Sequence, residues 1–299
     1  MKTLKTWMTA GLCAGALLSG AAALAQDAAH GPAAFPAPGS PTIYKSAGDL
    51  DKVFQAELAK KNPTTQSRVQ VTDRTSFNIV RRDQANTAVT HQGWDEIHYY
   101  LDGGGTIEVG CTTMHVKPGD IVFVPANSLH RYSALDGHVT YYEIRFPDAV
   151  GKSQGTTPPA APAAGGPGLY FSGEKIAADL AKAFKADNTQ GVVPVLVTDR
   201  FGINVLQRGA PGAAALHDGW NEMHYILAGQ GTLTTGGTTT GSGATLAIQG
   251  GVAQTMAKGD VMIVPANTPH QYTAMSPSVT YLEVRFPNVV GESAASPAR

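Results

Sequence analysis

The sequence of 299 residues has few of the residues that mark several common classes of protein. It contains 2 cysteines, Cys13 and Cys111, and the first of these lies in an N-terminal apolar segment. If that segment is removed, a single cysteine remains and no disulfide can form within the chain. Charged residues make up only 15% of the chain and the formal net charge is −1. The composition therefore does not indicate nucleic acid or an anionic membrane surface as a partner.

Long apolar runs are also scarce, and the one candidate lies at the N-terminus. Lys2 and Lys5 precede an apolar run over residues 7–24, which closes with Ala-Leu-Ala ending at Ala25. A basic start, an apolar core and an A-x-A end are typical of a secretory signal peptide. The alternative, a membrane anchor, is disfavoured because the core is short and rich in alanine. We therefore expect residues 1–25 to be cleaved and the mature protein to be periplasmic or secreted, without attachment to a membrane.

Glycine and proline are plentiful, at 34 and 19 residues, and they separate short runs rich in β-branched and aromatic residues. Such a pattern is typical of many short strands joined by turns, as in a β-sandwich or barrel. Three other stretches are too rich in small residues and proline to form a core. We expect them to be a mobile tail at 26–41, an inter-domain linker at 151–168 and a second tail at 291–299.

The chain repeats itself on either side of this linker. THQGWDEIHYYLDGGG at 90–105 returns as LHDGWNEMHYILAGQG at 216–231, an offset of 126 residues. Later the offset becomes 140, so that PGDIVFVPANSLHRY at 118–132 matches KGDVMIVPANTPHQY at 258–272. One ancestral unit has therefore been duplicated within the chain.

Two domains follow from the repeat, at 42–150 and 169–290. The change of offset adds 14 residues to the second copy, and these are rich in threonine and glycine. Such residues indicate an elongated hairpin or loop around 235–251 rather than additional core. Each copy also opens with a short amphipathic helix that follows a serine, Ser46 or Ser172.

Four polar residues recur at matched positions in the two copies. Successive side chains of a strand point to opposite faces, so Glu96 and His98 share one face, with Cα atoms about 6.6 Å apart. His91, before a glycine-containing bend, and His130, from a later strand, can reach the same interior. Three imidazoles and one carboxylate from different strands form a ligand set for a divalent transition metal. The sequence therefore predicts one metal site in each copy, with His91, Glu96, His98 and His130 in the first and His217, Glu222, His224 and His270 in the second.

The alternative is that each set is a buried hydrogen-bond network, or that it consists of unrelated histidines at strand ends. Such a network would not ordinarily require imidazole three times. The loops around the two sets have diverged, whereas the four polar positions have not. This contrast favours shared metal chemistry.

These motifs resemble those of the cupin superfamily of small β-barrels, and the duplicated chain resembles a bicupin. The first family motif is G-x5-H-x-H-x3,4-E-x6-G, and the spacings from Glu96 to Gly103 and from Glu222 to Gly229 match its second half. The second motif, G-x5-P-x-G-x2-H-x3-N, is matched through to its histidine by PGDIVFVPANSLH and KGDVMIVPANTPH. The resemblance implies an all-β fold of two tandem cupin barrels, of the double-stranded β-helix or jelly-roll type, each preceded here by a short helix.

The sequence departs from the family pattern at the ligands. Val89 and Ala215 replace the first histidine of H-x-H. The histidines two residues after each glutamate, His98 and His224, are expected to restore the lost ligand. The second motif also has asparagine where the family has glycine. These departures weaken the transfer of any one cupin activity, because ligand geometry controls which positions on the metal stay open.

Other repeated polar residues lie on shared strand faces. Tyr141, Glu143 and Arg145 share one face of the last strand in the first copy, and the pattern recurs in the second. We expect Glu143 and Arg145 to form a solvated or interfacial ion pair. Trp94 is expected at the mouth of the barrel, where it either packs or stacks on a ligand.

The resemblance implies dioxygenases, oxalate-degrading enzymes, isomerases and lyases as activities. We expect a metal-dependent oxidoreductase, a dioxygenase, that acts on a small oxygenated or phenolic molecule, with Fe²⁺, Mn²⁺, Ni²⁺ or Zn²⁺ as cofactor. Glu96 and Glu222 would then be catalytic, each as a general base. The alternatives are a metal-dependent lyase or isomerase, and a non-catalytic periplasmic protein that binds a metal or a small ligand. The fused copies are expected to form a monomeric pseudo-dimer or a homo-oligomer.

Overall fold

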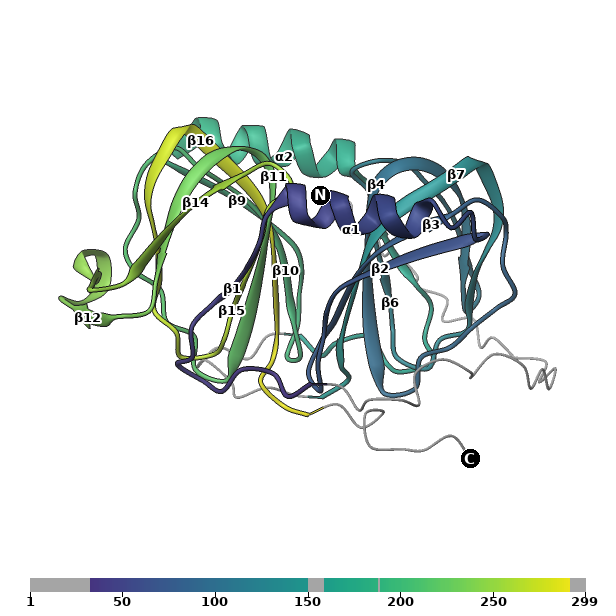
Figure 1. The fold of residues 1–299 in the computed structure, drawn as a ribbon, viewed down its shortest axis with the longest axis horizontal. Coiled ribbons are helices and arrows are strands. Elements are labelled where there is room, and N and C mark those ends of the chain that lie inside the picture. Colours follow the sequence, from purple (N-terminus) through teal and green to yellow (C-terminus); the bar gives the residue numbers. More distant parts are fainter. Residues whose placement is uncertain (1–32, 150–158, 188, 291–299) are drawn as a thin grey trace, which may run out of the picture.

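The computed structural model describes residues 33–149, 159–187 and 189–290. The predicted signal peptide and the predicted C-terminal tail lie outside these ranges. So do residues 26–32 of the predicted N-terminal tail and residues 151–158 of the predicted linker. Two seven-stranded antiparallel sheets are each curled into a barrel, and the barrels lie side by side (Figure 1). The predicted fold, two tandem all-β barrels, is confirmed.

The first barrel has six strands from the first copy and one from the second. Its two longest strands pair along most of their length and form the wall that carries the polar residues. Its strands are β2 (Thr64–Val71), β3 (Ser76–Arg82), β4 (Trp94–Val109), β5 (Thr112–Val116), β6 (Ile121–Val124), β7 (His130–Pro147) and β8 (Leu169–Phe171).

The second barrel repeats this plan with one strand borrowed from the first copy. Its strands are β1 (Ile43–Lys45), β9 (Gln190–Val197), β10 (Gly202–Arg208), β11 (Trp220–Thr235), β14 (Val252–Ala257), β15 (Val261–Val264) and β16 (His270–Pro287). The extra residues form a separate hairpin, as predicted, which projects from the far end of this barrel (Figure 1). It consists of β12 (Thr238–Thr240), the 3-10 helix η1 (Gly243–Thr245) and β13 (Ala247–Gln249).

The two copies exchange a short strand. β1 pairs with β15 of the second barrel, and β8 pairs with β6 of the first. The helix that follows each exchanged strand then packs back on its own copy, α1 (Ala47–Leu58) on β2 and α2 (Gly173–Asp187) on β9. The two barrels are therefore interlocked by main-chain hydrogen bonds as well as by side-chain packing. The domain limits drawn from the repeat do not describe this exchange and stay a prediction.

Strand alternation divides the apolar residues among three clusters. On β4, Tyr100 belongs to the cluster inside the first barrel, while Ile97 belongs to a cluster that joins the two barrels. That joining cluster contains Tyr142 and Tyr225, whose rings meet edge to face at 4.4 Å. The predicted alternation along residues 95–101 is confirmed, and it leaves one face of each long strand free to carry polar residues inside its barrel.

The two helices lie across the same side of the pair of barrels (Figure 1). Ser46 caps the first of them, since its hydroxyl accepts a hydrogen bond from the N–H of Asp49 at 3.1 Å. Within the described residues, neither helix is long and apolar enough to cross a membrane.

The end of the predicted N-terminal tail is packed rather than mobile. Phe35 is only 4% exposed, and its ring lies 5.8 Å from that of Phe286. Its backbone N–H donates to Asp73 of the repeated VTDR turn at 2.7 Å. The described part of the linker behaves in the same way, because Ala161 donates to the matching Asp199 at 2.8 Å. Composition did not predict this packing. The two segments are poor in core-forming residues, but Asp73, Asp199 and Phe35 hold them against the barrels.

Candidate metal centres

The carboxylate at the centre of the first site lies on the inward face of β4. Glu96 is 0% exposed and stands directly opposite Arg145 of β7. Two residues later on β4 and two residues earlier on β7, His98 stands opposite Glu143. Cross-strand neighbours on one face have Cβ atoms roughly 5 Å apart, so these four charged or polar groups must interact. In the second barrel the register is the same, with Glu222 opposite Arg285 and His224 opposite Glu283.

His91 reaches this carboxylate from the loop that precedes β4. The loop is held by Asn127, whose N–H donates to the carbonyl of His91 at 3.1 Å and whose side chain accepts from the N–H of Gly93. Asn127 has a φ of 63°, a left-handed conformation that asparagine tolerates better than most residues. Asn127 stands where the cupin motif has glycine. Asn267 stands at the matching position of the second copy with a φ of 59°, so asparagine keeps the same left-handed turn in both copies.

His130 is the first residue of β7 and has a fixed orientation. Its Nδ1 lies 3.0 Å from the carbonyl of Ser128, which can only accept, so Nδ1 donates. The other ring nitrogen, Nε2, faces Glu96 at 3.6 Å. His270 repeats the contact with the carbonyl of Thr268 at 3.1 Å. A carbonyl that orients an imidazole from behind is the usual support of a metal-binding histidine.

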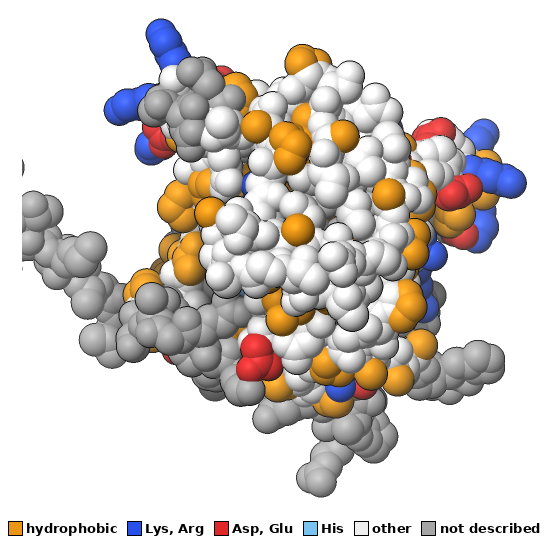
Figure 2. All heavy atoms as spheres, turned by 90° about the vertical axis from the view of Figure 1, so that its left-hand side faces the viewer, with side chains coloured by type: hydrophobic (Ala, Val, Ile, Leu, Met, Phe, Trp, Pro, Cys, Tyr) orange, Lys and Arg blue, Asp and Glu red, His pale blue; other side chains and the backbone are white. Residues whose placement is uncertain are grey.

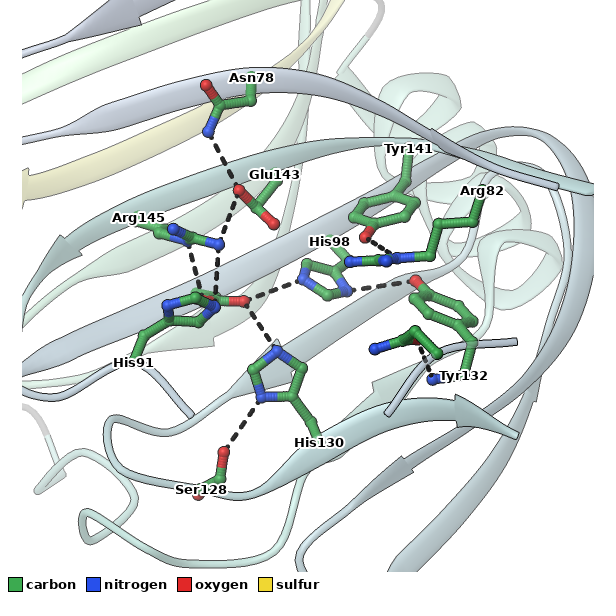
Figure 3. Close-up of polar contacts among 12 residues, drawn as sticks. Asn78, Arg82, His91, His98, Ser128, His130, Tyr132, Tyr141, Glu143 and Arg145 are labelled. Carbon is green, nitrogen blue, oxygen red and sulfur yellow. Dashed lines mark hydrogen bonds and ion pairs between the residues drawn. The ribbon is translucent and has the colours of Figure 1, made fainter. Parts of the chain in front are cut away.

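The three imidazoles share the two oxygens of one carboxylate (Figure 3). His91 Nε2 lies 3.0 Å from Glu96 Oε1, and His98 Nε2 lies 3.1 Å from Glu96 Oε2. In the second barrel, Oε1 of Glu222 is 2.9 Å from His217, and Oε2 is 3.4 Å from His224 and 2.8 Å from His270. Every residue of the predicted ligand sets therefore contacts the central glutamate of its barrel.

The predicted four-residue sets nevertheless divide in two. In the first barrel, potential ligand atoms of His91, Glu96 and His130 all lie within 4.8 Å of one another. His98 instead groups with Glu96 and Glu143, and the second barrel divides in the same way. His98 Nδ1 also lies 3.3 Å from the hydroxyl of Tyr132. This contact and the one to Glu96 fit an imidazole that accepts at Nδ1, donates from Nε2 and orients the carboxylate.

The charges of the first site are strongly coupled. Burial raises the pKa of Glu96, but the imidazoles of His91 and His130 and the guanidinium of Arg145 more than offset this and hold the pKa well below its usual range. Burial likewise opposes ionisation of Glu143, and Arg145 outweighs it, so that pKa is also lowered. The site therefore contains two buried carboxylates and one guanidinium.

His130 and His270, the first residues of β7 and β16, are called the strand-end histidines here, and their pKa values shift in opposite directions. Burial lowers the pKa of His130 and outweighs the attraction of Glu96. Burial also opposes protonation of His270, but the closer Glu222 outweighs it and raises the pKa. Relative to an ordinary histidine, protonation is therefore disfavoured at His130 and favoured at His270. A metal ion bound to His270 would take the place of that proton.

The residues present fit a divalent metal ion. Neutral His130, with a proton on Nδ1, directs the lone pair of Nε2 toward Glu96, which is also an acceptor. His91 Nε2 lies 2.9 Å from Arg145 Nη2, which can only donate, and its lone pair is therefore held 3.0 Å from the same carboxylate. Three acceptors that converge in a buried place need a cation beside them, a role that Arg145 fills in part and that a divalent metal ion fits as well. Two histidines and one carboxylate are the set that holds non-haem Fe²⁺ in many oxygenases.

A cavity of about 70 Å³ lies beside this set in the second barrel. It is lined by both strand-end and loop histidines and by two arginines, with alanine at its rim: Arg208, Ala215, His217, His270, Tyr281 and Arg285. Ligand pockets usually measure roughly 300–1,000 Å³. This one admits a small molecule or the reacting end of a larger one.

The comparisons with known proteins agree with this architecture. The family profile described as the cupin domain matches residues 81–144 and 203–284. The chain is a bicupin. No curated protein matches the sequence.

Solved structures share the fold of this bicupin at low sequence identity. A salicylate 1,2-dioxygenase from Pseudoaminobacter salicylatoxidans, in adduct with gentisate, is 10% identical, with a TM-score of 0.61, and the match covers 84% of this chain and 82% of the other. A putative glyoxylate induced protein from Pseudomonas aeruginosa is 14% identical, with a TM-score of 0.55, and the match covers 91% and 95%. At such identities the likeness establishes the fold alone.

Sequence reasoning missed the arginines of the bicupin's two sites. Glu143 and Arg145 do not form the expected solvated or interfacial pair, because both point into the barrel, where Glu143 is 3% exposed. The signal was present in the alternation of YYEIRF, repeated as YLEVRF, which puts tyrosine, glutamate and arginine on one inward face. Arg82, which shares a strand face with Asn78, also lies in this interior and donates to the hydroxyl of Tyr141 at 3.0 Å.

Proposed function

We propose that this bicupin is a metal-dependent oxidoreductase, a dioxygenase, that acts on a small oxygenated or phenolic molecule. The observation that carries the proposal is the convergence of two histidines and one carboxylate in each barrel, around His91, Glu96 and His130 in the first. This donor set suits Fe²⁺, and Mn²⁺, Ni²⁺ or Zn²⁺ are accepted by the same ligand types. Support for the reaction class also comes from the salicylate 1,2-dioxygenase that shares the fold.

The division of roles follows from the contacts. His91 and His130, or His217 and His270, would hold the metal with the central glutamate, and the metal would supply a Lewis acid with open positions for substrate and dioxygen. His98 holds the orientation of Glu96 by its contact at 3.1 Å. Glu96 would be the group to accept a proton from a substrate hydroxyl.

The surroundings of the second site limit the substrate. The cavity of about 70 Å³ and its lining by Arg208 and Arg285 favour a small molecule with an oxygen-rich, anionic end. A phenolic acid could present only its hydroxyl and carboxylate there. The same proposal has the protein exported, because residues 1–25 match the three-part pattern of a signal peptide.

The experiment is anaerobic loading with Fe²⁺, removal of free metal, and measurement of oxygen uptake with a panel of phenolic and short hydroxy acids that includes salicylate and gentisate. We expect uptake that is stoichiometric with product and is lost in the double variant Glu96→Gln, Glu222→Gln. Product formation without oxygen uptake would contradict the dioxygenase and indicate a lyase or isomerase.

A second candidate function is the non-catalytic binding of a metal or small ligand in the periplasm. The small volume of the cavity favours it, because about 70 Å³ leaves little room for both dioxygen and an organic substrate. Tight binding of Fe²⁺ with neither oxygen uptake nor product across the panel would establish this function instead.

A further inference from the structure

An arginine is built into the donor set of the first barrel. Arg145 Nε lies 2.9 Å from Glu96 Oε1, and Nη2 lies 3.0 Å from Glu143 Oε1. The same Nη2 lies 2.9 Å from His91 Nε2 (Figure 3). A guanidinium carries a positive charge and only N–H donors, so Nη2 can only donate to His91 Nε2, and the charge attracts both carboxylates.

This contact uses the lone pair with which His91 would bind a metal. His91 Nε2 and Glu96 Oε1 are 3.0 Å apart, and both are acceptors when Arg145 donates to the imidazole. Two acceptors at that separation repel each other unless a cation stands beside them. Arg145 is that cation in the structure, since its guanidinium lies 2.9 Å from each of the two atoms.

The second barrel also places one arginine against both of its glutamates, there through Nε. Arg285 Nε lies 2.6 Å from Glu222 Oε1 and 3.0 Å from Glu283 Oε1. Oε1 is also the oxygen that His217 approaches at 2.9 Å. The loops around the two sites have diverged, yet in both barrels the guanidinium meets the oxygen shared with the loop histidine.

The geometry points to Arg145 and Arg285 as internal counter-ions that hold each donor set together in the metal-free protein and compete with the divalent cation for Glu96 and Glu222 Oε1. In the first barrel the competition includes Nε2 of His91. The inference rests on the proposed function, because it concerns the same metal. Each barrel is then stable without metal, and the affinity for metal is set by how easily the guanidinium withdraws to the second glutamate.

The test uses the variant Arg145→Met in a His270→Ala background, in which only the first site is left to bind metal. Co²⁺ is titrated anaerobically and followed by its visible absorption. We expect the affinity for Co²⁺ to rise at least about tenfold over the His270→Ala parent, because the competing cation is gone and two carboxylates remain. The melting temperature of the metal-free variant should fall by roughly 6 °C or more, since an unpaired buried charge is left. Co²⁺ should restore it.

The matched control is Arg131→Met on the same strand, which removes an exposed ion pair with Glu108 at 2.8 Å. It should change neither the Co²⁺ affinity nor the melting temperature measurably. The variant Arg145→Lys keeps the charge but loses the planar donors, and it should raise the affinity by less than Arg145→Met.

An affinity for Co²⁺ that stays the same or falls in Arg145→Met would overturn the inference. If Arg145→Met does not fold, an unchanged affinity in Arg145→Lys overturns it equally. Failure of the His270→Ala parent to bind Co²⁺ at all would contradict the proposed function instead, and the metal-free melting temperatures would still test the counter-ion role.

Discussion

The two barrels contain the same donor residues but divide them differently around the central carboxylate. In the first barrel, Oε2 of Glu96 lies closer to His98, at 3.1 Å, than to His130, at 3.6 Å. In the second, Oε2 of Glu222 lies closer to the strand-end histidine, at 2.8 Å, than to His224, at 3.4 Å. In each barrel, Oε2 of the central glutamate is thus shared between two imidazoles. One belongs to the deep histidine, His98 or His224, and the other to the strand-end histidine, and a shift of a few tenths of an ångström decides which of them lies closer.

The surroundings explain part of this difference. Tyr100 in the first barrel is replaced by Ile226 in the second, and only Tyr100 can add a hydrogen bond, at 2.9 Å, to the hydroxyl of Tyr132. Tyr132 in turn contacts His98 at 3.3 Å, so the first barrel holds its deep imidazole more firmly. Hydrogen bonds two contacts away therefore tune a site whose own residues are unchanged.

The mouths of the barrels differ as well. Val89 and Ala215 occupy equivalent positions, each bridged to the strand-end histidine, and Ala215 lines the cavity of the second barrel. The extra hairpin lies beside the second mouth, where the N–H of Ala214 donates to the carbonyl of Leu246 at 2.8 Å. The end of the second barrel shows charged side chains mainly toward its margins (Figure 2). The two candidate sites therefore have the same donor residues but different residues at their mouths.

The largest expected effect is on the central glutamates. Glu96→Gln should lower the metal affinity of the first site more than about 100-fold and leave the second unchanged, because a charged ligand matters more than the supporting residues, whose loss costs roughly 10- to 100-fold. Glu222→Gln should do the converse. The measurement is competition between protein and a chromophoric chelator for Co²⁺. An equal loss at both sites in either single variant would show that the barrels are not independent.

A smaller effect is expected at the deep histidines. His98→Ala should weaken metal binding roughly 10- to 100-fold, because it removes the donor that orients Glu96. His224→Ala should weaken it less, since its contact with Glu222 is 3.4 Å long. The same chelator competition measures both. A complete loss of metal in His98→Ala would show that this residue is a ligand, as the sequence predicted. An unchanged affinity would show that it neither binds the metal nor orients Glu96.

The third prediction concerns stability at a position where the copies differ in charge. Asp95 is buried and its pKa is raised to about 6, mainly by burial, with the N–H of Ala126 and Arg200 acting in the opposite direction. An acid whose pKa is higher in the folded protein stabilises the fold at low pH, and that stability is lost as the pH rises through about 6. Asn221 holds the matching position and accepts from Ala266 at 2.9 Å.

Asp95→Asn should therefore increase the free energy of unfolding at pH 8 by about 2 kcal/mol and change it little at pH 4. Denaturant unfolding at the two pH values is the measurement. The matched variant, Asn221→Asp, should lower stability at pH 8. A loss of stability in Asp95→Asn at pH 8 would mean that the ionised carboxylate is needed by Arg200.

The smallest effect is expected at the mouths. Ala215→Val gives the second barrel the residue of the first and reduces the room in a cavity of about 70 Å³. The concentration of substrate needed for half-maximal oxygen uptake should rise roughly 3- to 10-fold, in the range that one or two methyl groups contribute. Metal content should stay constant. Val89→Ala is the reciprocal variant, and loss of metal in either would place these residues in the ligand scaffold rather than at the entrance.

The fold and the central ligands followed from local rules. Duplication, strand alternation along residues 95–101 and the repeated glycine turns predicted two β-rich units of sandwich or barrel type and the inward position of Glu96, and the resemblance to the cupin motifs implied barrels. The division between His98 and His130 could not be predicted, because it depends on distances of a few tenths of an ångström between side chains from different strands. The exchange of β1 and β8 was equally hidden, since each is only 3 residues long and pairs with the other copy.

The roles of Glu143 and Arg145 show another limit. Their spacing predicted a shared face, but a face can point inward or outward, and an ion pair is more often solvated. What decides the matter is the register that places Arg145 opposite Glu96, and register is fixed by the whole sheet.

The most direct test of the account is the metal content of each barrel. The purified protein, loaded with Fe²⁺ or Co²⁺ and freed of excess, should contain two tightly bound ions per chain, one for each donor set. His130→Ala and His270→Ala should each retain one ion, and the double variant none. A protein that binds no divalent metal, or single variants that still hold two ions, would contradict the account.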